Sequence, residues 1–221
     1  MNTIGTTLVH QLILPEKAKE KNPTLILLHG RGADEEDLLG LSDYLDERLL
    51  LISVRAPFPF TYGGGYTWYD VGTTADPDPA MFHKSYGALS RFLDDILAGY
   101  PVDRAKVFLL GFSMGTVMAY AISLTRPTLC RGVIANSGYV PEGTDLVFQW
   151  DVLASIDYFV AHGVIDPVIP VQFGRRAKEL LEKAGANLEY HEYPMAHQIS
   201  EASLSDAAGW LKRRLNGEED R

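Results

Sequence analysis

The residues best suited to chemistry lie at positions 111–115, which read Gly-Phe-Ser-Met-Gly. This pentapeptide follows directly on an apolar run, and a helical pattern comes after it. At a strand-to-helix turn the motif holds its serine in a strained conformation with the hydroxyl projecting from the sheet, and the two glycines relieve the crowding. The helix N-terminus also favours negative charge there. So short a pattern is common by chance, but in this context it predicts Ser113 as the nucleophile of an acyl transfer.

A serine hydroxyl becomes a good nucleophile when a base takes its proton and a carboxylate orients that base. In folds that carry this motif, the chain order is serine, acid, histidine. His197 lies in a loop after the last predicted strand, and Asp166 follows the strand before it. Taken alone, His197 could equally be a solvated loop histidine, and Asp166 could equally be a turn aspartate before a proline. Asp151 and Asp157 precede a strand rather than follow it, so we predict Asp166 as the acid and His197 as the base.

Acyl transfer builds negative charge on a carbonyl oxygen, which requires preorganised N–H donors. One donor is expected from the residue after the nucleophile, Met114, and the other from the loop after an early strand. That loop reads His-Gly-Arg-Gly over residues 29–32. By position we assign the second donor to the backbone N–H of Arg31. The Arg31 side chain has two open interpretations, covering the site or lying in solvent, and His29 is expected to order the loop.

The segment 55–70 has the most unusual composition in the chain, because its aromatic residues alternate with glycines and prolines. Such a segment after a strand end suits the wall of an apolar substrate pocket. Core packing beneath a long loop is an equally good interpretation. Few residues remain for a large lid, which favours an open site and short or medium acyl chains. The predicted pocket residues are Phe58, Phe60, Tyr66, Trp68 and Tyr69.

Short apolar runs alternate along the chain with longer amphipathic segments. This alternation predicts an α/β fold, with a compact, mostly parallel sheet of about seven strands and helices on both faces. Ligands of such sheets bind beyond the carboxyl ends of the strands. The predicted strands are residues 8–14, 24–28, 50–54, 106–110, 132–136, 158–162 and 187–192. The predicted helices are residues 34–48, 79–99, 113–125, 171–184 and 199–215.

The chain of 221 residues fits one domain, 1–221, with a polar tail at 216–221 that is expected to be flexible. Its formal charge of −9 and its pI near 5.1 argue against a nucleic-acid partner or an anionic membrane surface. We expect no membrane span and no signal peptide, and a single cysteine suits a reducing cytoplasm. Without metal-site spacing of the histidines or a phosphate-binding glycine loop, we also expect no metal and no cofactor.

Several short sequences add to the serine pentapeptide: Leu-Leu-His-Gly-Arg-Gly-Ala-Asp at 27–34, Arg-Ala-Pro at 55–57, Trp-Tyr-Asp at 68–70, His-Gly-Val-Ile-Asp-Pro at 162–167 and Ala-His at 196–197. Over about residues 25–211 the chain resembles the phospholipase/carboxylesterase family of α/β-hydrolases, which includes acyl-protein thioesterases and bacterial carboxylesterases. The resemblance implies the α/β-hydrolase fold and a cofactor-independent ester hydrolase. It also implies a triad of Ser113, Asp166 and His197, with oxyanion donors at Arg31 and Met114.

Two positions depart from the eukaryotic thioesterases of that family. Those enzymes usually have glutamine where this chain has Met114, and they often have leucine where it has Arg31. Both departures are similar to the bacterial esterase branch, and they argue against protein depalmitoylation.

The leading interpretation is a serine carboxylesterase that hydrolyses short- to medium-chain carboxylic esters through an acyl-enzyme on Ser113. An acyl-thioesterase or a lysophospholipase would differ in leaving group and chain length. A catalytically silent hydrolase-fold binding protein is a third interpretation, because a fold alone does not establish turnover. We expect a cytoplasmic protein whose partner is a small-molecule ester, and the sequence leaves a homodimer open.

Overall fold

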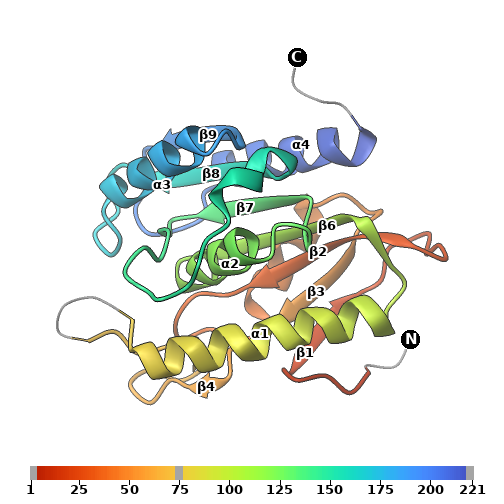
Figure 1. Ribbon diagram of the computed structural model, residues 1–221. Coiled ribbons are helices and arrows are strands. Elements are labelled where there is room, and N and C mark those ends of the chain that lie inside the picture. Colours follow the sequence, from red (N-terminus) through yellow and green to blue (C-terminus); the bar gives the residue numbers. More distant parts are fainter. Residues whose placement is uncertain (1–3, 73–76, 218–221) are drawn as a thin grey trace.

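The computed structural model describes residues 4–72 and 77–217. Its centre is a seven-stranded sheet in the order β1-β3-β2-β6-β7-β8-β9 (Figure 1), in which β1 is antiparallel and the other strands run parallel. The strands of this sheet are β1 (His10–Ile13), β2 (Asn22–Leu28), β3 (Leu50–Val54), β6 (Val102–Phe112), β7 (Gly132–Asn136), β8 (Asp157–Gly163) and β9 (Asn187–Tyr193). A separate hairpin pairs β4 (Phe58–Pro59) with β5 (Tyr66–Thr67).

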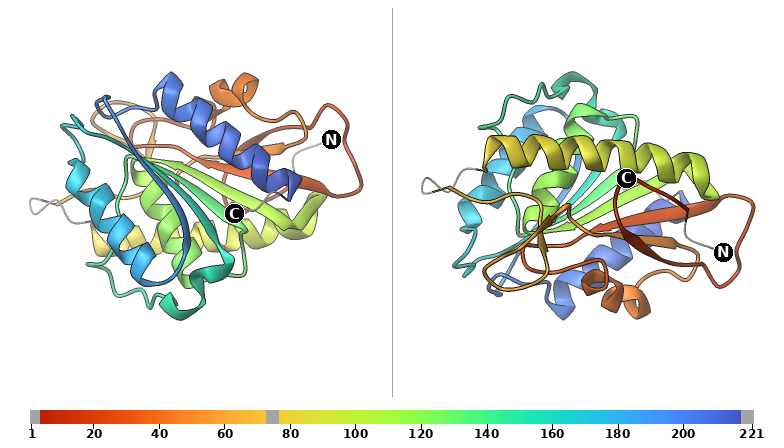
Figure 2. Two further views of the ribbon diagram at one scale, coloured as in Figure 1. Left: turned by 90° about the horizontal axis from the view of Figure 1, so that it is seen from above. Right: turned by 90° about the horizontal axis from the view of Figure 1, so that it is seen from below.

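Helices cover both faces of the sheet (Figure 2). On one face lie α1 (Pro79–Gly99), α2 (Met114–Thr125) and α3 (Val171–Lys183). On the other face α4 (Glu201–Asn216) packs with a 3-10 helix, η1 (Asp37–Tyr44). A second 3-10 helix, η2 (Trp150–Ser155), precedes β8. Because both faces are covered, the central strands are buried and are nearly continuous in apolar residues.

Local sequence determines where the helices begin and end. α1 begins at Pro79, and the Asp78 side chain accepts a hydrogen bond from the Met81 N–H at 2.8 Å. α4 begins with a capping box between Ser200 and Ser203. This cap fixes the chain just after His197, so it contributes to the placement of the candidate base.

The predicted sheet is confirmed, as are four of the five predicted helices, whose ends agree within two residues. The prediction of an α-helix over 34–48 is wrong, because only η1 forms there. Gly40 and the weak helix formers Ser42 and Asp43 interrupt the pattern, and the Asp34 side chain accepts from the Glu36 N–H in a local turn. The β4–β5 hairpin and η2 were not predicted.

The predicted tail, 216–221, begins within the end of α4. Asn216 is the last residue of that helix, and Gly217 follows it with a left-handed φ of 74°. Residues 218–221 lie outside the described residues.

Two further features concern chemistry away from the sheet edge. Cys130 is buried, and burial raises the pKa of its thiol to about 12, so it is a core side chain rather than a reactive thiol. In the described part of the chain, no helix is both long enough and apolar enough to cross a membrane.

Candidate active site

Ser113 lies at the turn between β6 and α2 with φ 56° and ψ −119°, a conformation that non-glycine residues rarely adopt. Its N–H donates to the Asn136 carbonyl at the end of β7 (3.0 Å), which holds the turn against the neighbouring strand. Glycines on either side make room for this turn. A Cβ at Gly111 would collide with the first turn of α2, and one at Gly115 would collide with the Leu28 carbonyl. The turn therefore presents a hydroxyl at the carboxyl end of the sheet.

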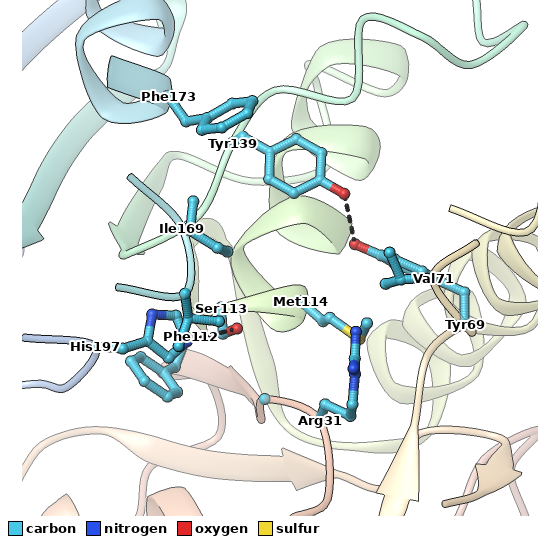
Figure 3. Close-up of a pocket in the computed structure, with 12 residues that line it drawn as sticks. Arg31, Tyr69, Val71, Phe112, Ser113, Met114, Tyr139, Ile169, Phe173 and His197 are labelled. Atoms are coloured by element: carbon cyan, nitrogen blue, oxygen red, sulfur yellow. Dashed lines mark hydrogen bonds between the residues drawn. The ribbon is translucent and has the colours of Figure 1, made fainter. Parts of the chain in front are cut away.

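The structure brings Ser113, His197 and Asp166 together from three separate loops. His197 Nε2 lies 2.9 Å from Ser113 Oγ, and His197 Nδ1 lies 2.7 Å from Asp166 Oδ2. In Figure 3 the His197 ring faces the Ser113 hydroxyl, with the Phe112 ring beside it at a centroid distance of 4.9 Å. Because an ionised carboxylate only accepts hydrogen bonds, Nδ1 carries the proton and Nε2 is left to accept from the serine. This is the geometry that a general base requires.

Asp166 is held by its own loop. Its Oδ1 accepts hydrogen bonds from the N–H groups of Val168 (2.8 Å) and Ile169 (2.9 Å), which leaves Oδ2 for His197. Burial by itself raises the pKa of Asp166, but the hydrogen bonds from His197, Ile169 and Val168 outweigh it and hold that pKa below its usual value. The carboxylate is therefore ionised beside the imidazole at neutral pH.

His162, to which sequence reasoning assigned no role, anchors the loop that carries Asp166. This buried residue in β8 donates through Nε2 to the Ile169 carbonyl at 2.8 Å. Burial lowers the pKa of His162, so its ring is neutral and the donor nitrogen is defined by its carbonyl partner. The sequence feature that could have indicated it is a histidine at a strand end, four residues before the candidate acid.

The backbone N–H groups of Arg31 and Met114, the two predicted oxyanion donors, belong to residues that line one cavity with Ser113. Within residues 4–72 and 77–217, neither N–H donates a hydrogen bond to another group of the chain. Met114 is also the first residue of α2, where the helix dipole adds positive potential. Both groups are therefore available to an oxygen that gains negative charge.

The loop 29–32 is fixed from two sides. The His29 ring donates through Nδ1 to the Gly30 carbonyl (2.6 Å) and accepts through Nε2 from the Ala56 N–H (3.0 Å), so it orders the loop as the sequence predicts. From the other side, the Trp68 indole N–H donates to the His29 carbonyl at 2.9 Å. These contacts fix the loop that carries the Arg31 N–H.

Of the five aromatic residues predicted to form the pocket, the structure places Tyr69 in the cavity wall. The other four lie around the loop 29–32 and the hairpin. Trp68 is fully buried, Tyr66 lies beneath the Arg55 guanidinium at 4.5 Å, Phe60 lies beside Gly32, and Phe58 is in β4. The bridge between Ala33 and Tyr66 ties the hairpin to this loop and so directs these rings away from the cavity. Of these four rings only Trp68 is a core side chain, and Phe58, Phe60 and Tyr66 are half-buried, so core packing describes Trp68 rather than the whole segment.

A cavity of about 400 Å³, a size common for small-molecule sites, opens beside Ser113 (Figure 3). Several of its apolar walls come from the segments after β7 and β8, which sequence reasoning did not assign to the pocket. The lining residues are Gly30, Arg31, Tyr69, Val71, Phe112, Ser113, Met114, Tyr139, Val168, Ile169, Phe173 and His197. Among the described residues, no group of three or more His, Cys, Asp or Glu side chains is arranged to hold a metal ion.

Comparison with known proteins places this site in a family. Residues 10–215 match the family model described as phospholipase/carboxylesterase. The chain belongs to this family. The match runs from β1 nearly to the end of α4, so all the residues that line the cavity lie within it.

Two fungal proteins similar to this chain carry the same name, acyl-protein thioesterase 1. The acyl-protein thioesterase 1 of Candida albicans is 25% identical over 224 residues, which cover 92% of this chain and 97% of that protein. The enzyme of the same name from Debaryomyces hansenii is 28% identical over 218 residues, with 88% and 92% covered.

Solved structures show the same fold. The Bacillus cereus carboxylesterase is 26% identical with a TM-score of 0.82, and the match covers 93% of this chain and 94% of that one. The carboxylesterase from Mesorhizobium loti has the same TM-score at 20% identity, with 94% and 95% covered, and so shows the shared fold. The α/β-hydrolase fold and the family resemblance predicted from the sequence are thereby confirmed.

Proposed function

We propose that the protein is a serine carboxylesterase that hydrolyses short- to medium-chain esters of small molecules. The observation that carries this proposal is the run of hydrogen-bonding contacts from Ser113 through His197 to Asp166, at the wall of an apolar cavity. A hydrolase fold is compatible with many functions, so the proposal depends on this site rather than on the fold.

In the proposed acylation, His197 Nε2 takes the proton of the Ser113 hydroxyl while Oγ forms a bond to the ester carbonyl carbon. The N–H groups of Arg31 and Met114 stabilise the negative charge on the carbonyl oxygen. The tetrahedral intermediate then expels the alcohol, which takes the proton from His197. Water attacks the resulting acyl-enzyme as the same nitrogen removes its proton. The carboxylic acid leaves, and the proton returns to Ser113.

The size and lining of the cavity support a short or medium acyl chain. A volume of about 400 Å³ suits a small ester, and Val71, Ile169 and Phe173 provide apolar contacts for its chain. We therefore expect kcat/KM to rise with the first few methylene groups and to fall once the chain outgrows the cavity.

A second candidate, an acyl-thioesterase, is favoured by the names of the fungal relatives. A thioester would form the same acyl-enzyme on Ser113, and only the leaving group would differ. Ester and thioester substrates with the same acyl chain therefore separate the two activities.

The test is a kcat/KM series with nitrophenyl esters of increasing chain length and with thioesters of the same acids. We expect the highest values for short or medium esters. A preference for thioesters would transfer the assignment to the second candidate, and a preference for long-chain esters would contradict the proposed chain length. If the protein hydrolyses none of these substrates, it is a binding protein of the hydrolase fold, and the proposal is wrong.

The nucleophile is tested separately by Ser113→Ala, which we expect to keep the fold and to lose nearly all turnover. A fluorophosphonate should label the wild type and leave Ser113→Ala unlabelled in a mass spectrum. Ser205→Ala is the matched control, because Ser205 is exposed on α4 and does not line the cavity. Labelling of Ser113→Ala would contradict the assignment.

A further inference from the structure

Arg31 lines the cavity and is also exposed to solvent, so its side chain covers the site from the outside. Among the described residues its guanidinium forms no ion pair, and its central carbon lies 5.8 Å from the centre of the Phe60 ring. In Figure 3 the side chain extends from its loop along the cavity, across from His197 and Ile169. An entering substrate would therefore meet this cation.

The acidic residues nearest to Arg31 in the sequence are engaged elsewhere. Glu35 forms an ion pair with Arg55, and the Asp34 carboxylate accepts a hydrogen bond from the Glu36 N–H at 2.9 Å. Most other arginines of the described chain are ion-paired. Among the described residues, Arg31 is thus a cation without an ion-pair partner at the proposed substrate site.

The described lining residues bring no negative charge of their own into the cavity, since no acidic side chain is among them. The Asp166 carboxylate is buried with its Oδ2 on His197 Nδ1. Val71 and Phe173 are apolar, and the Tyr69 hydroxyl lies 3.2 Å from that of Tyr139. Burial raises the pKa of Tyr69 well above its ordinary value, and the positive charge of Arg31 opposes this rise. The electrostatic field of Arg31 therefore reaches a side chain in the cavity wall.

We propose that the Arg31 guanidinium selects esters that carry a carboxylate, which it binds while the ester carbonyl is held at Ser113. This inference rests on the proposed esterase function and names a substrate class for it. A planar guanidinium offers two parallel N–H donors to a carboxylate, and such a charge-assisted pair is stronger in a partly closed apolar cavity than in water. The net charge of −9 repels anions at long range, so a local cation is needed for the cavity to accept one.

The carboxylate can be carried on either side of the ester bond, and two matched substrate pairs distinguish the sides. For the acyl side, nitrophenyl monoadipate is compared with nitrophenyl hexanoate, which has the same chain length and no charge. For the alcohol side, carboxyphenyl butyrate is compared with carbamoylphenyl butyrate. In each pair the measured quantity is the ratio of kcat/KM for the anionic ester to kcat/KM for the neutral ester. Any change that Arg31 substitution causes in the backbone oxyanion donor cancels in this ratio.

The wild type should prefer the anionic member of one pair, and Arg31→Gln should lower that ratio about tenfold or more. Arg31→Lys keeps the charge but not the planar fork, and should retain part of the preference. The matched control is Arg91→Gln, which removes the same charge from an exposed position on α1 and should leave the ratio unchanged.

An unchanged ratio in Arg31→Gln, or an equal fall in Arg91→Gln, overturns the inference, because the preference would then not arise in the cavity. If neither ester is hydrolysed, the proposed function has failed, and a binding measurement still tests the inference. Calorimetric titration with adipate should then show binding that Arg31→Gln weakens about tenfold. Adipate binding that is absent, or that Arg31→Gln does not weaken, contradicts the role of Arg31 independently of turnover.

Discussion

His162 and Ile169 form a hydrogen bond of 2.8 Å, from Nε2 of the buried imidazole to the Ile169 carbonyl. The N–H of the same Ile169 donates to Asp166 Oδ1 at 2.9 Å. Ile169 is therefore fixed through its carbonyl by His162 of β8, and through its N–H it fixes the carboxylate of Asp166. His162 acts through Ile169 and does not touch the serine, which makes it a positioning residue.

The variant His162→Leu removes the donor to Ile169, so we expect Asp166 to lose its fixed position and kcat to fall by about tenfold or more, with a smaller change in KM. His162→Gln keeps an N–H donor and should recover part of the loss. Steady-state kinetics with a nitrophenyl ester measure both, and circular dichroism verifies that the variants are folded.

His191→Gln is the control for this comparison, because His191 lies partly exposed in β9 and pairs with Glu189 outside the cavity. A kcat for His162→Leu equal to that of the wild type would show that the Asp166 loop does not depend on the imidazole. Equal losses in His162→Leu and His162→Gln would show that packing rather than the hydrogen bond matters.

Two buried aspartates, Asp157 at the start of β8 and Asp166 in the loop after it, should respond differently to the same change. Asp157 lies 2.6 Å from the Arg131 guanidinium and accepts from the Asn187 side chain at 2.7 Å. Asp157→Asn should cost about 2 kcal/mol of unfolding free energy, because it removes the buried carboxylate that pairs with the half-exposed Arg131 guanidinium. Asp166→Asn should instead lower kcat by several orders of magnitude, since the imidazole loses the group that orients it.

Urea unfolding and single-turnover acylation on the same samples separate these two effects. Asp157→Asn should retain kcat per folded molecule, and Asp166→Asn should keep a cooperative unfolding transition. A mild effect of Asp166→Asn on turnover would assign the acid to another residue.

The site residues that the sequence predicts are those whose position follows from neighbouring residues in the sequence or from the order of the strands. Ser113 is flanked by glycines that only a sharp strand-to-helix turn requires, and the structure shows that turn with φ 56°. Asp166 and His197 follow strand ends, and parallel strands bring their carboxyl ends to one edge. The sequence order of these elements was therefore enough to place the three side chains near one another.

Side-chain direction in the aromatic segment could not be predicted in the same way. Strands β4 and β5 are two residues each, too short for an alternating pattern to show which face their side chains take. Their register depends on a contact with Ala33, which is distant in the sequence. Trp68 and Tyr69 are adjacent, yet one supports the loop 29–32 and the other lines the cavity. The prediction of a helix over 34–48 was wrong for a related reason. It rested on the spacing of apolar residues, which carries no information about the local turns that compete with a helix.

Gly115, the last residue of the serine motif, is expected to be as important for stability as for activity. A Cβ at Gly115 would meet the carbonyl oxygens of Leu28 and His29, which are backbone atoms and cannot move aside cheaply. Gly115→Ala should therefore reduce the unfolding free energy by about 2 kcal/mol or more and displace the loop that carries Arg31. Gly143→Ala is the control, because its added Cβ meets nothing within 4 Å. Thermal unfolding that is equal for the two variants would contradict the close approach of α2 to β2.

The free energy of unfolding should depend on pH because of three buried histidines. Burial lowers the pKa of His10, His29 and His162 from the ordinary value of 6.5. Below pH 6.5 the unfolded chain binds protons at these residues that the folded chain does not yet bind, so the free energy of unfolding falls as pH falls. Their contribution is complete above 6.5 and is lost as the pH decreases toward the lowered values. The lowered pKa of Asp166 acts in a separate window, below the ordinary value of 3.8.

Urea unfolding of the wild type at about pH 7.5 and about pH 5.5 measures this dependence. His10 is the residue to substitute, because it lies in β1 with its Nε2 bound to the Tyr100 hydroxyl at 2.7 Å and does not line the cavity. His10→Gln lacks a titrating ring, so its stability should decrease less between the two pH values than that of the wild type, even if it is less stable at both. Equal stability of the wild type at the two pH values would contradict the prediction for the three rings together. An equal decrease in His10→Gln would show that His10 accepts a proton as readily in the folded chain as in the unfolded one.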